Sequence, residues 1–198
     1  MDSARPQANE RFSIRQKTTL MINRYVVTET LPDGSDGRVV AFAEQKRMTL
    51  KEQMTFYTDE SKDHVLFTAK ARQVLDAGAA YDVRDAMDSP IGTFRKKFAA
   101  SLLRSTWELD QPDAVEAVGR ERNRLVAVVR RFWELLPLDL VPFVWPYHFD
   151  FTSGDKPVMS VDKKIGLRDR YLLDVTSPDL DLRLAIAQAV ALDAFQSR

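Results

Sequence analysis

The stretch LAIAQAVALDAF at residues 184–195 decides the fold, because it is apolar around most of a helical circumference. Only Gln188 and Asp193 interrupt it, and a helix that is apolar on nearly all sides is buried on nearly all sides. Alanine at alternate positions keeps the helix slender enough to fit inside a closed sheet, and Asp179 or Asp181 can cap its first N–H groups. A helix of this length rises only about 18 Å, too short for the roughly 30 Å core of a bilayer. We therefore predict a buried helix over 180–196.

The sequence before this helix predicts antiparallel strands. Short runs of β-branched and aromatic residues are separated by polar turn clusters such as PDGSDG at 32–37, a pattern typical of all-β proteins. Within runs such as 65–70 and 81–84, the side chains alternate so that one face is apolar and the other faces water. The predicted strands are 12–17, 24–29, 38–44, 55–58, 64–72, 80–85, 91–97, 105–109, 114–119, 147–151, 157–163 and 169–175.

Residues 120–136 predict an amphipathic helix. Arg120, Arg124 and Arg131 share one side, and the apolar residues recur at helical spacing on another: Leu125, Val128, Val129, Phe132 and Leu136. The valine-rich stretch 125–129 also fits a strand, since periodicity does not separate the two in a short apolar run. The segment that follows, PLDLVPFVWP at 137–146, contains three prolines, which exclude a regular helix, and its apolar content predicts that it packs or binds.

A barrel threaded by the apolar helix buries both the apolar strand faces and the helix. The sequence therefore predicts a mainly β protein, a closed antiparallel β-barrel of about 12 strands around a buried C-terminal hydrophobic helix. We expect one domain over 12–198, a flexible N-terminus over 1–11, and a monomer.

The amino-acid composition excludes several classes of function. The chain has 198 residues, 44% of them hydrophobic, with 29 Lys+Arg against 29 Asp+Glu. Zero net charge gives no global reason to expect nucleic-acid binding, and the absence of cysteine excludes disulfides, thiolate catalysis and cysteine-ligated metals. No run of about 18 apolar residues predicts a membrane span, and the N-terminal stretch has no apolar core of a secretory signal. The expected location is the cytoplasm.

Several segments carry a family resemblance: AFAEQKRMTLKEQMTFYTDES at 41–61, FTAKARQ at 67–73, YDVRDAMDSPIGTFRKKF at 81–98, SLLRSTW at 101–107, YHFDF at 147–151 and AVALDAFQSR at 189–198. Together they resemble the LURP-one-related family, in particular its bacterial members, within the tubby C-terminal-like superfamily. That superfamily also includes tubby proteins and phospholipid scramblases. The resemblance thus implies a barrel around a helix, phosphoinositide-headgroup binding and membrane association. No acidic calcium loop of the scramblase type is present, so calcium-triggered scrambling is not expected.

The sequence offers little for catalysis. Its two histidines, His64 and His148, are not in metalloprotease spacing, and the chain has no nucleophile elbow, phosphate-binding loop or dinucleotide fingerprint. His148 and Asp150 lie two apart on one strand face and could form half a metal site or an acid–base pair, but a structural hydrogen-bonding role fits them as well. We expect no enzyme, no metal and no cofactor.

Clustered basic residues point instead to an anionic partner, because their side chains hold phosphate oxygens. We expect anionic lipid headgroups to contact Arg95, Lys96, Lys97, Arg120, Arg124 and Arg131. Phe143 and Trp145, in the apolar segment, are the candidate membrane contacts at a peripheral site on the cytoplasmic face.

A protein-interaction module is the alternative. Exposed strand edges or the apolar segment 137–146 could dock a protein partner by strand addition or groove burial. Nucleic acid is not expected as a partner, since the basic residues alternate with acidic ones and no aromatic stacking platform is recognisable.

Overall fold

The computed structural model describes residues 10–18, 22–46, 53–72, 80–97, 106–122, 148–164 and 170–196. They form twelve strands and one helix in the order β1 (Glu10–Thr18), β2 (Ile22–Thr30), β3 (Asp36–Lys46), β4 (Gln53–Tyr57), β5 (Val65–Ala71), β6 (Ala80–Asp85), β7 (Pro90–Lys97), β8 (Thr106–Gln111), β9 (Val115–Glu121), β10 (His148–Ser153), β11 (Lys156–Lys164), β12 (Arg170–Val175) and α2 (Leu182–Gln196). Every run predicted as a strand contributes to one of these strands.

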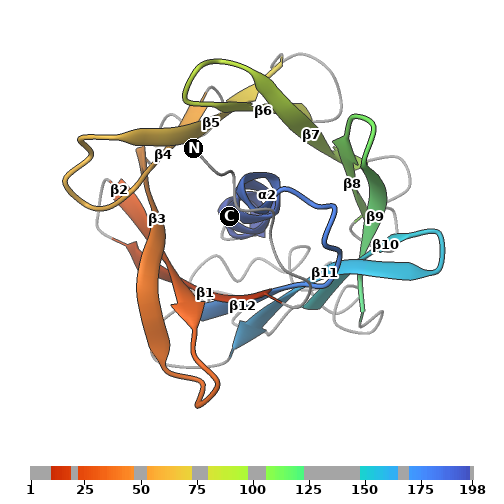
Figure 1. Cartoon of the computed structure of the whole chain (residues 1–198), viewed down its shortest axis with the longest axis horizontal. Coiled ribbons are helices and arrows are strands. Elements are labelled where there is room, and N and C mark those ends of the chain that lie inside the picture. Colours follow the sequence, from red (N-terminus) through yellow and green to blue (C-terminus); the bar gives the residue numbers. More distant parts are fainter. Residues whose placement is uncertain are drawn as a thin grey trace, which may run out of the picture.

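The strands form a closed antiparallel barrel around α2, which confirms the predicted architecture (Figure 1). Each strand pairs with its neighbours in the sequence, and β1 pairs with β12 from Glu10↔Val175 to Arg15↔Arg170 to complete the ring. Closure gives every described strand a neighbour on both sides, although β3 pairs with β4 only from Phe42 to Glu44. The closed ring thus limits strand addition to short unpaired stretches, and that route to a protein partner stays a prediction.

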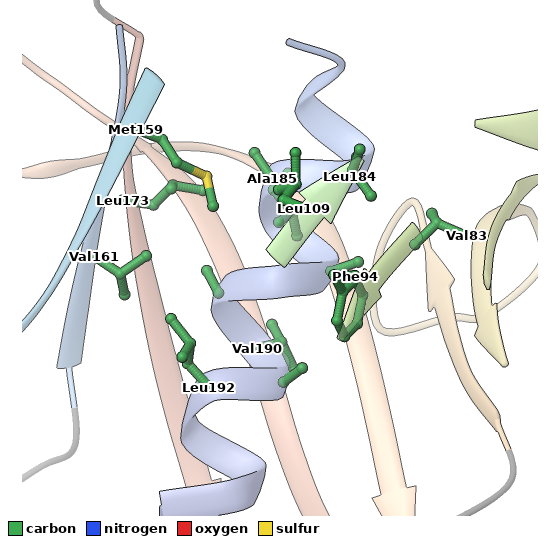
Figure 2. Packing of buried hydrophobic residues seen from close by; sticks show 14 of the residues in the cluster. Val83, Phe94, Leu109, Met159, Val161, Leu173, Leu184, Ala185, Val190 and Leu192 are labelled. Atoms are coloured by element: carbon green, nitrogen blue, oxygen red, sulfur yellow. The ribbon is translucent and has the colours of Figure 1, made fainter. Parts of the chain in front are cut away.

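The core lies between the inner face of the barrel and the helix. Residues Leu184 to Leu192 of α2 are all buried, with exposed fractions of 4% or less. Figure 2 shows α2 between Val83 and Phe94 on one side and Met159, Val161 and Leu173 on the other, with Leu109 of β8 overlapping the helix in this view. The predicted buried helix is thus confirmed. One of its two polar interruptions, Gln188, is fully buried, and neither of its amide atoms has a hydrogen-bond partner in the described part of the chain.

Asp181 rather than Asp179 caps the helix. The Arg183 N–H donates to Asp181 Oδ1 at 2.9 Å, and the Ala185 N–H donates to the Asp181 carbonyl at 3.1 Å. Gln111, at the end of β8, fixes the entry to the helix by accepting a 2.7 Å hydrogen bond from the Asp181 N–H and donating one of 3.0 Å to the Asp179 carbonyl. These bonds satisfy donors that a helix N-terminus leaves open and join α2 to the barrel wall.

Gly92 on β7 lets the helix and the next strand approach closely. A Cβ atom built there would lie 2.6 Å from the Asp110 carbonyl oxygen of β8 and 2.7 Å from Leu184 Cδ2 of α2. The crowding that this glycine relieves comes from β8 and the helix.

The alternating strand directions define two ends of the barrel. All six described connections are at one end, which we call the turn end. Five join two strands, at 31–35, 58–64, 86–89, 112–114 and 154–155, and the sixth, at 176–181, joins β12 to α2. The last residues of β1, β3, β5, β7, β9 and β11 and the first residues of β2, β4, β6, β8, β10 and β12 are at the far end. Helix α2 begins at the turn end and runs toward the far end.

Two boundaries differ from the sequence interpretation. Glu10 and Arg11, assigned by the pattern to the N-terminal extension, begin β1 and pair with β12. Arg120 and Glu121, assigned to the start of an amphipathic helix, are the last residues of β9. That strand continues because Ala117, Gly119 and Glu121 keep alternating onto the buried inner face. The rest of the segment 120–136, from residue 123 onward, lies outside the described residues.

Candidate anion-binding surface

The outer face of β7, β8 and β9 brings three predicted binding residues together. Alternation along β7 puts Arg95 and Lys97 on the outer face, where both are exposed. Lys97 is opposite Thr106 of β8, and Thr106 is in turn opposite Arg120 of β9. We call Lys97, Thr106 and Arg120 the cationic row. Neighbouring strands are about 4.8 Å apart, so the two basic residues of the row leave the sheet about 10 Å apart.

Lys96 does not share this surface. It alternates with Gly92 and Phe94, which face the helix, and it is opposite the fully buried Trp107 in register. The three consecutive basic residues at 95–97 are therefore divided between the two faces of the barrel wall.

Glu108 on β8 binds two of the predicted cations. Its carboxylate lies 2.5 Å from Arg95 Nε and also pairs with Lys97 Nζ. Burial alone raises the pKa of Glu108, but hydrogen bonds from Lys97 and Arg95 outweigh this effect, and the pKa lies below its ordinary value. Glu108 is thus ionised at neutral pH and neutralises one of the two positive charges. Because these groups are largely exposed, the pairs contribute little to folding stability.

Arg120 carries positive charge that no described acidic side chain neutralises. It is exposed, and its register neighbour on β10 is Asp150. The Asp150 carboxylate instead accepts two hydrogen bonds from Arg122, with Nε–Oδ2 and Nη2–Oδ1 distances of 2.8 and 2.5 Å. Among the described residues, no carboxylate therefore pairs with Arg120.

His148 and Asp150, which the sequence offered as half a metal site or an acid–base pair or as structural residues, are not bonded to each other. His148 Nδ1 lies 2.7 Å from Asp162 Oδ1 on β11, while Asp150 holds Arg122 and raises the pKa of that arginine. No group of three or more potential ligands among the described residues could hold a metal ion. His148 is hydrogen bonded to Asp162 and Asp150 is ion paired with Arg122, which fits the structural role that the sequence left open.

A groove of about 610 Å³ lies beside the Arg95–Glu108 pair on the outer wall. Its lining comes from the ends of β5 and β6 and from β7 to β10 and carries both signs of charge: Arg72, Arg95, Glu108, Asp110, Glu116 and Thr152. Arg72 is paired with Asp82 at 2.7 Å. Asp110 and Glu116, directly opposite one another in register, give the middle of the groove an acidic character.

Sequence reasoning missed two residues of this surface, Thr106 and Glu108. The signal was available in part, since the strands predicted at 91–97 and 105–109 form a hairpin in which opposite residues can be counted once the register is known. The remaining predicted site residues, Arg124, Arg131, Phe143 and Trp145, lie outside the described residues, and their roles stay predictions. In the portion that is described, no helix combines the length and the apolar character that crossing a membrane requires.

Comparison with known proteins identifies the family. A search of the curated proteins gives no match. A family model described as LURP-one-related matches residues 39–193, which include strands from β3 to β12, the cationic row and most of α2. The match covers more than half of the chain and agrees with a barrel closed around an apolar C-terminal helix. This chain belongs to the LURP-one-related family.

Proposed function

We propose that the protein is a non-catalytic module that binds anionic phospholipid headgroups and associates peripherally with the cytoplasmic face of a membrane. The observation that carries this proposal is the cationic row, in which Arg120 is exposed and free of described acidic partners beside Lys97. The tubby-like resemblance of the family supports the same ligand class.

The chemistry of the row fits a phosphate group. The Arg120 guanidinium can donate two parallel hydrogen bonds to phosphate oxygens, and the Lys97 ammonium adds a second positive charge across Thr106. Each basic residue near an anionic bilayer contributes about 1 kcal/mol to binding. Two such residues give weak, reversible binding, as expected of a peripheral protein.

The proposal that the module is non-catalytic rests on the contacts of two side chains of β10. His148 and Asp150, the pair with the best catalytic spacing in the sequence, are held apart by Asp162 and Arg122. A general base is oriented toward the group whose proton it takes, and a hydrogen bond joins the His148 ring to the Asp162 carboxylate rather than to a hydroxyl group.

Substituting both Lys97→Gln and Arg120→Gln is expected to weaken binding to vesicles of phosphatidylcholine and phosphatidylserine (3:1) about 25-fold. The expected factor is about fivefold for each charge, at about 1 kcal/mol per basic residue. Co-sedimentation over a range of lipid concentrations measures it. The control is Lys156→Gln, an exposed lysine at the turn end of β11. Equal affinities of the double variant and the wild-type protein would show that the row is not the binding surface.

Removing the Glu108 carboxylate, which neutralises part of the positive charge beside the cationic row, should tighten binding to the vesicles. Glu108→Gln frees Lys97 and Arg95 from their shared carboxylate and is expected to tighten binding to the same vesicles about fivefold. Glu29→Gln, which removes the partner of Arg38 near the turn end, is the matched control and should leave the affinity unchanged. A Glu108→Gln variant that binds no more tightly than the wild-type protein contradicts the assignment of Arg95 and Lys97 to the surface.

The groove favours a second candidate, an adaptor that binds a protein segment. Its mixed lining, with Asp110 and Glu116 in the middle, suits a peptide that carries basic side chains. This candidate takes precedence if the wild-type protein binds neither neutral nor anionic vesicles. Its discriminating test is whether Asp110→Asn abolishes capture of a partner that the wild-type protein retains.

A further inference from the structure

The strands that run toward the far end all finish in basic residues. A lysine or arginine occupies the last or the penultimate position of each: Lys17 in β1, Lys46 in β3, Lys70 in β5, Lys97 in β7, Arg120 in β9 and Lys164 in β11. We call these residues the basic rim. Since the strands alternate in direction, the six residues are on alternate strands around the whole closed barrel, about 10 Å from one to the next.

Acidic residues are concentrated at the turn end. Each of the six described connections contains at least one aspartate: Asp33, Asp59, Asp88, Asp113, Asp155 and Asp179. Two of these carboxylates accept backbone hydrogen bonds within their turns, Asp33 from Ser35 and Asp59 from Ser61. Hydrogen bonds from the side chains of Ser35 and Ser61, and then from their backbone N–H groups, lower the pKa of Asp33 and of Asp59, so both remain ionised at neutral pH.

Local structure explains the acidic residues of the turn end but not the basic residues of the far end. Aspartate is a favoured turn residue because its side chain bonds the backbone two residues on, so the acidic turns have a cause in turn chemistry. Strand ends have no comparable requirement for lysine or arginine. Lys70, Arg120 and Lys164 are exposed and have no ion-pair partner among the described residues, whereas Lys17 lies 3.8 Å from Glu60. The charges of Lys70, Arg120 and Lys164 are thus not used by any described ion pair.

We infer that the protein docks end-on, with the basic rim at the far end against the anionic bilayer and the acidic turn end directed away from it. This inference rests on the proposed function and adds the orientation. A chain with no net charge is attracted to a charged surface when its charges are separated, because the near end feels the surface potential most strongly and the potential decays within about 10 Å. The acidic end would be repelled, so only one orientation is favoured.

Lys70 and Lys164 distinguish end-on docking from side-on docking by the outer face of β7, β8 and β9. They are six strands apart in the closed order of twelve, on opposite sides of the barrel, so no side-on contact reaches both. Lys156 is the matched control for Lys164, because the two exposed lysines are the first and last residues of β11 and differ in the end they occupy.

The test is co-sedimentation of the double variant Lys70→Gln, Lys164→Gln with vesicles of phosphatidylcholine and phosphatidylserine (3:1), with thermal melting to confirm that each variant folds. End-on docking predicts about 25-fold weaker binding than that of the wild-type protein, and an unchanged affinity for Lys156→Gln. Normal binding by the double variant, with loss of binding in Lys97→Gln, Arg120→Gln, overturns the orientation and leaves the proposed function intact. Equal weakening by Lys156→Gln also overturns it. A wild-type protein that does not sediment overturns both.

Discussion

Replacing Ala191 with glutamate is expected to leave no folded protein. Ala191 is fully buried and Ala189 is 1% exposed, on a helix enclosed by the barrel wall (Figure 1). A carboxylate without a partner at either position costs several kcal/mol, which is comparable to the whole free energy of unfolding of an ordinary domain, about 5–15 kcal/mol. The measurement is the yield of soluble protein together with circular dichroism and urea unfolding.

Ala114→Glu provides the matched control for this substitution. Ala114 is exposed in the connection between β8 and β9, so the same added carboxylate remains in water and the free energy of unfolding should change by less than about 0.5 kcal/mol. Soluble Ala189→Glu and Ala191→Glu proteins that unfold cooperatively at the wild-type urea concentration would contradict the position of α2 inside the barrel.

Gly92→Ala is expected to lower the free energy of unfolding by about 3 kcal/mol, at the upper end of the usual cost of overpacking. The new methyl group would lie 2.6 Å from the Asp110 carbonyl oxygen and 2.7 Å from Leu184 Cδ2. The carbonyl belongs to a paired strand and cannot rotate away, so β7, β8 and α2 must separate. For a chain of this size, the loss corresponds to a fall in Tm of about 6–12 °C, measurable by thermal melting.

Gly37→Ala tests whether that effect comes from the packing of the helix. A Cβ atom at Gly37 meets first Leu31 Cδ2, at 3.1 Å, and Leu31 is an exposed side chain that can move. We expect a small change in Tm for this variant. An equal Tm for Gly92→Ala and the wild-type protein would mean that α2 does not press against β7 as the structure shows.

Sequence pattern predicted the fold because the barrel depends on signals that are local. Residues 65–70 and 81–84 alternate with a period of two, which only a strand with one buried face explains, and 184–195 is apolar on nearly every side. A set of one-faced strands and an all-round apolar helix have few ways to bury their surfaces together, and the closed barrel is one of them.

The composition of the candidate site was harder to predict, because neighbours in a sheet are set by register. Arg95, Lys96 and Lys97 are consecutive, and the pleat sends Lys96 to the inner face. Glu108, which neutralises part of the predicted cluster, is 13 residues from Arg95 in the chain and directly opposite it in the sheet. The basic rim becomes visible only when strand direction and closure are known.

The boundary near residue 120 shows how two periodicities overlap. Arg120 fits a helical spacing with Arg124 and Arg131, yet it also continues the alternation of Val115, Ala117 and Gly119 as an outward residue. Pairing with β8 and β10 decides in favour of the strand, with Thr106↔Arg120 and Arg120↔Asp150 in register. The strands that pair in the barrel wall can be far apart in the sequence, so a short stretch of sequence does not reveal their hydrogen bonds.

Binding of the wild-type protein to vesicles tests the central claim most directly. Purified protein is co-sedimented with phosphatidylcholine vesicles and with phosphatidylcholine–phosphatidylserine vesicles (3:1), each at low ionic strength and at about 0.5 M salt, where exposed charges are largely screened. The account predicts sedimentation with the anionic vesicles at low salt, loss of most of that binding at high salt, and none with the neutral vesicles. Binding to neither vesicle, or equal binding to both, would contradict it.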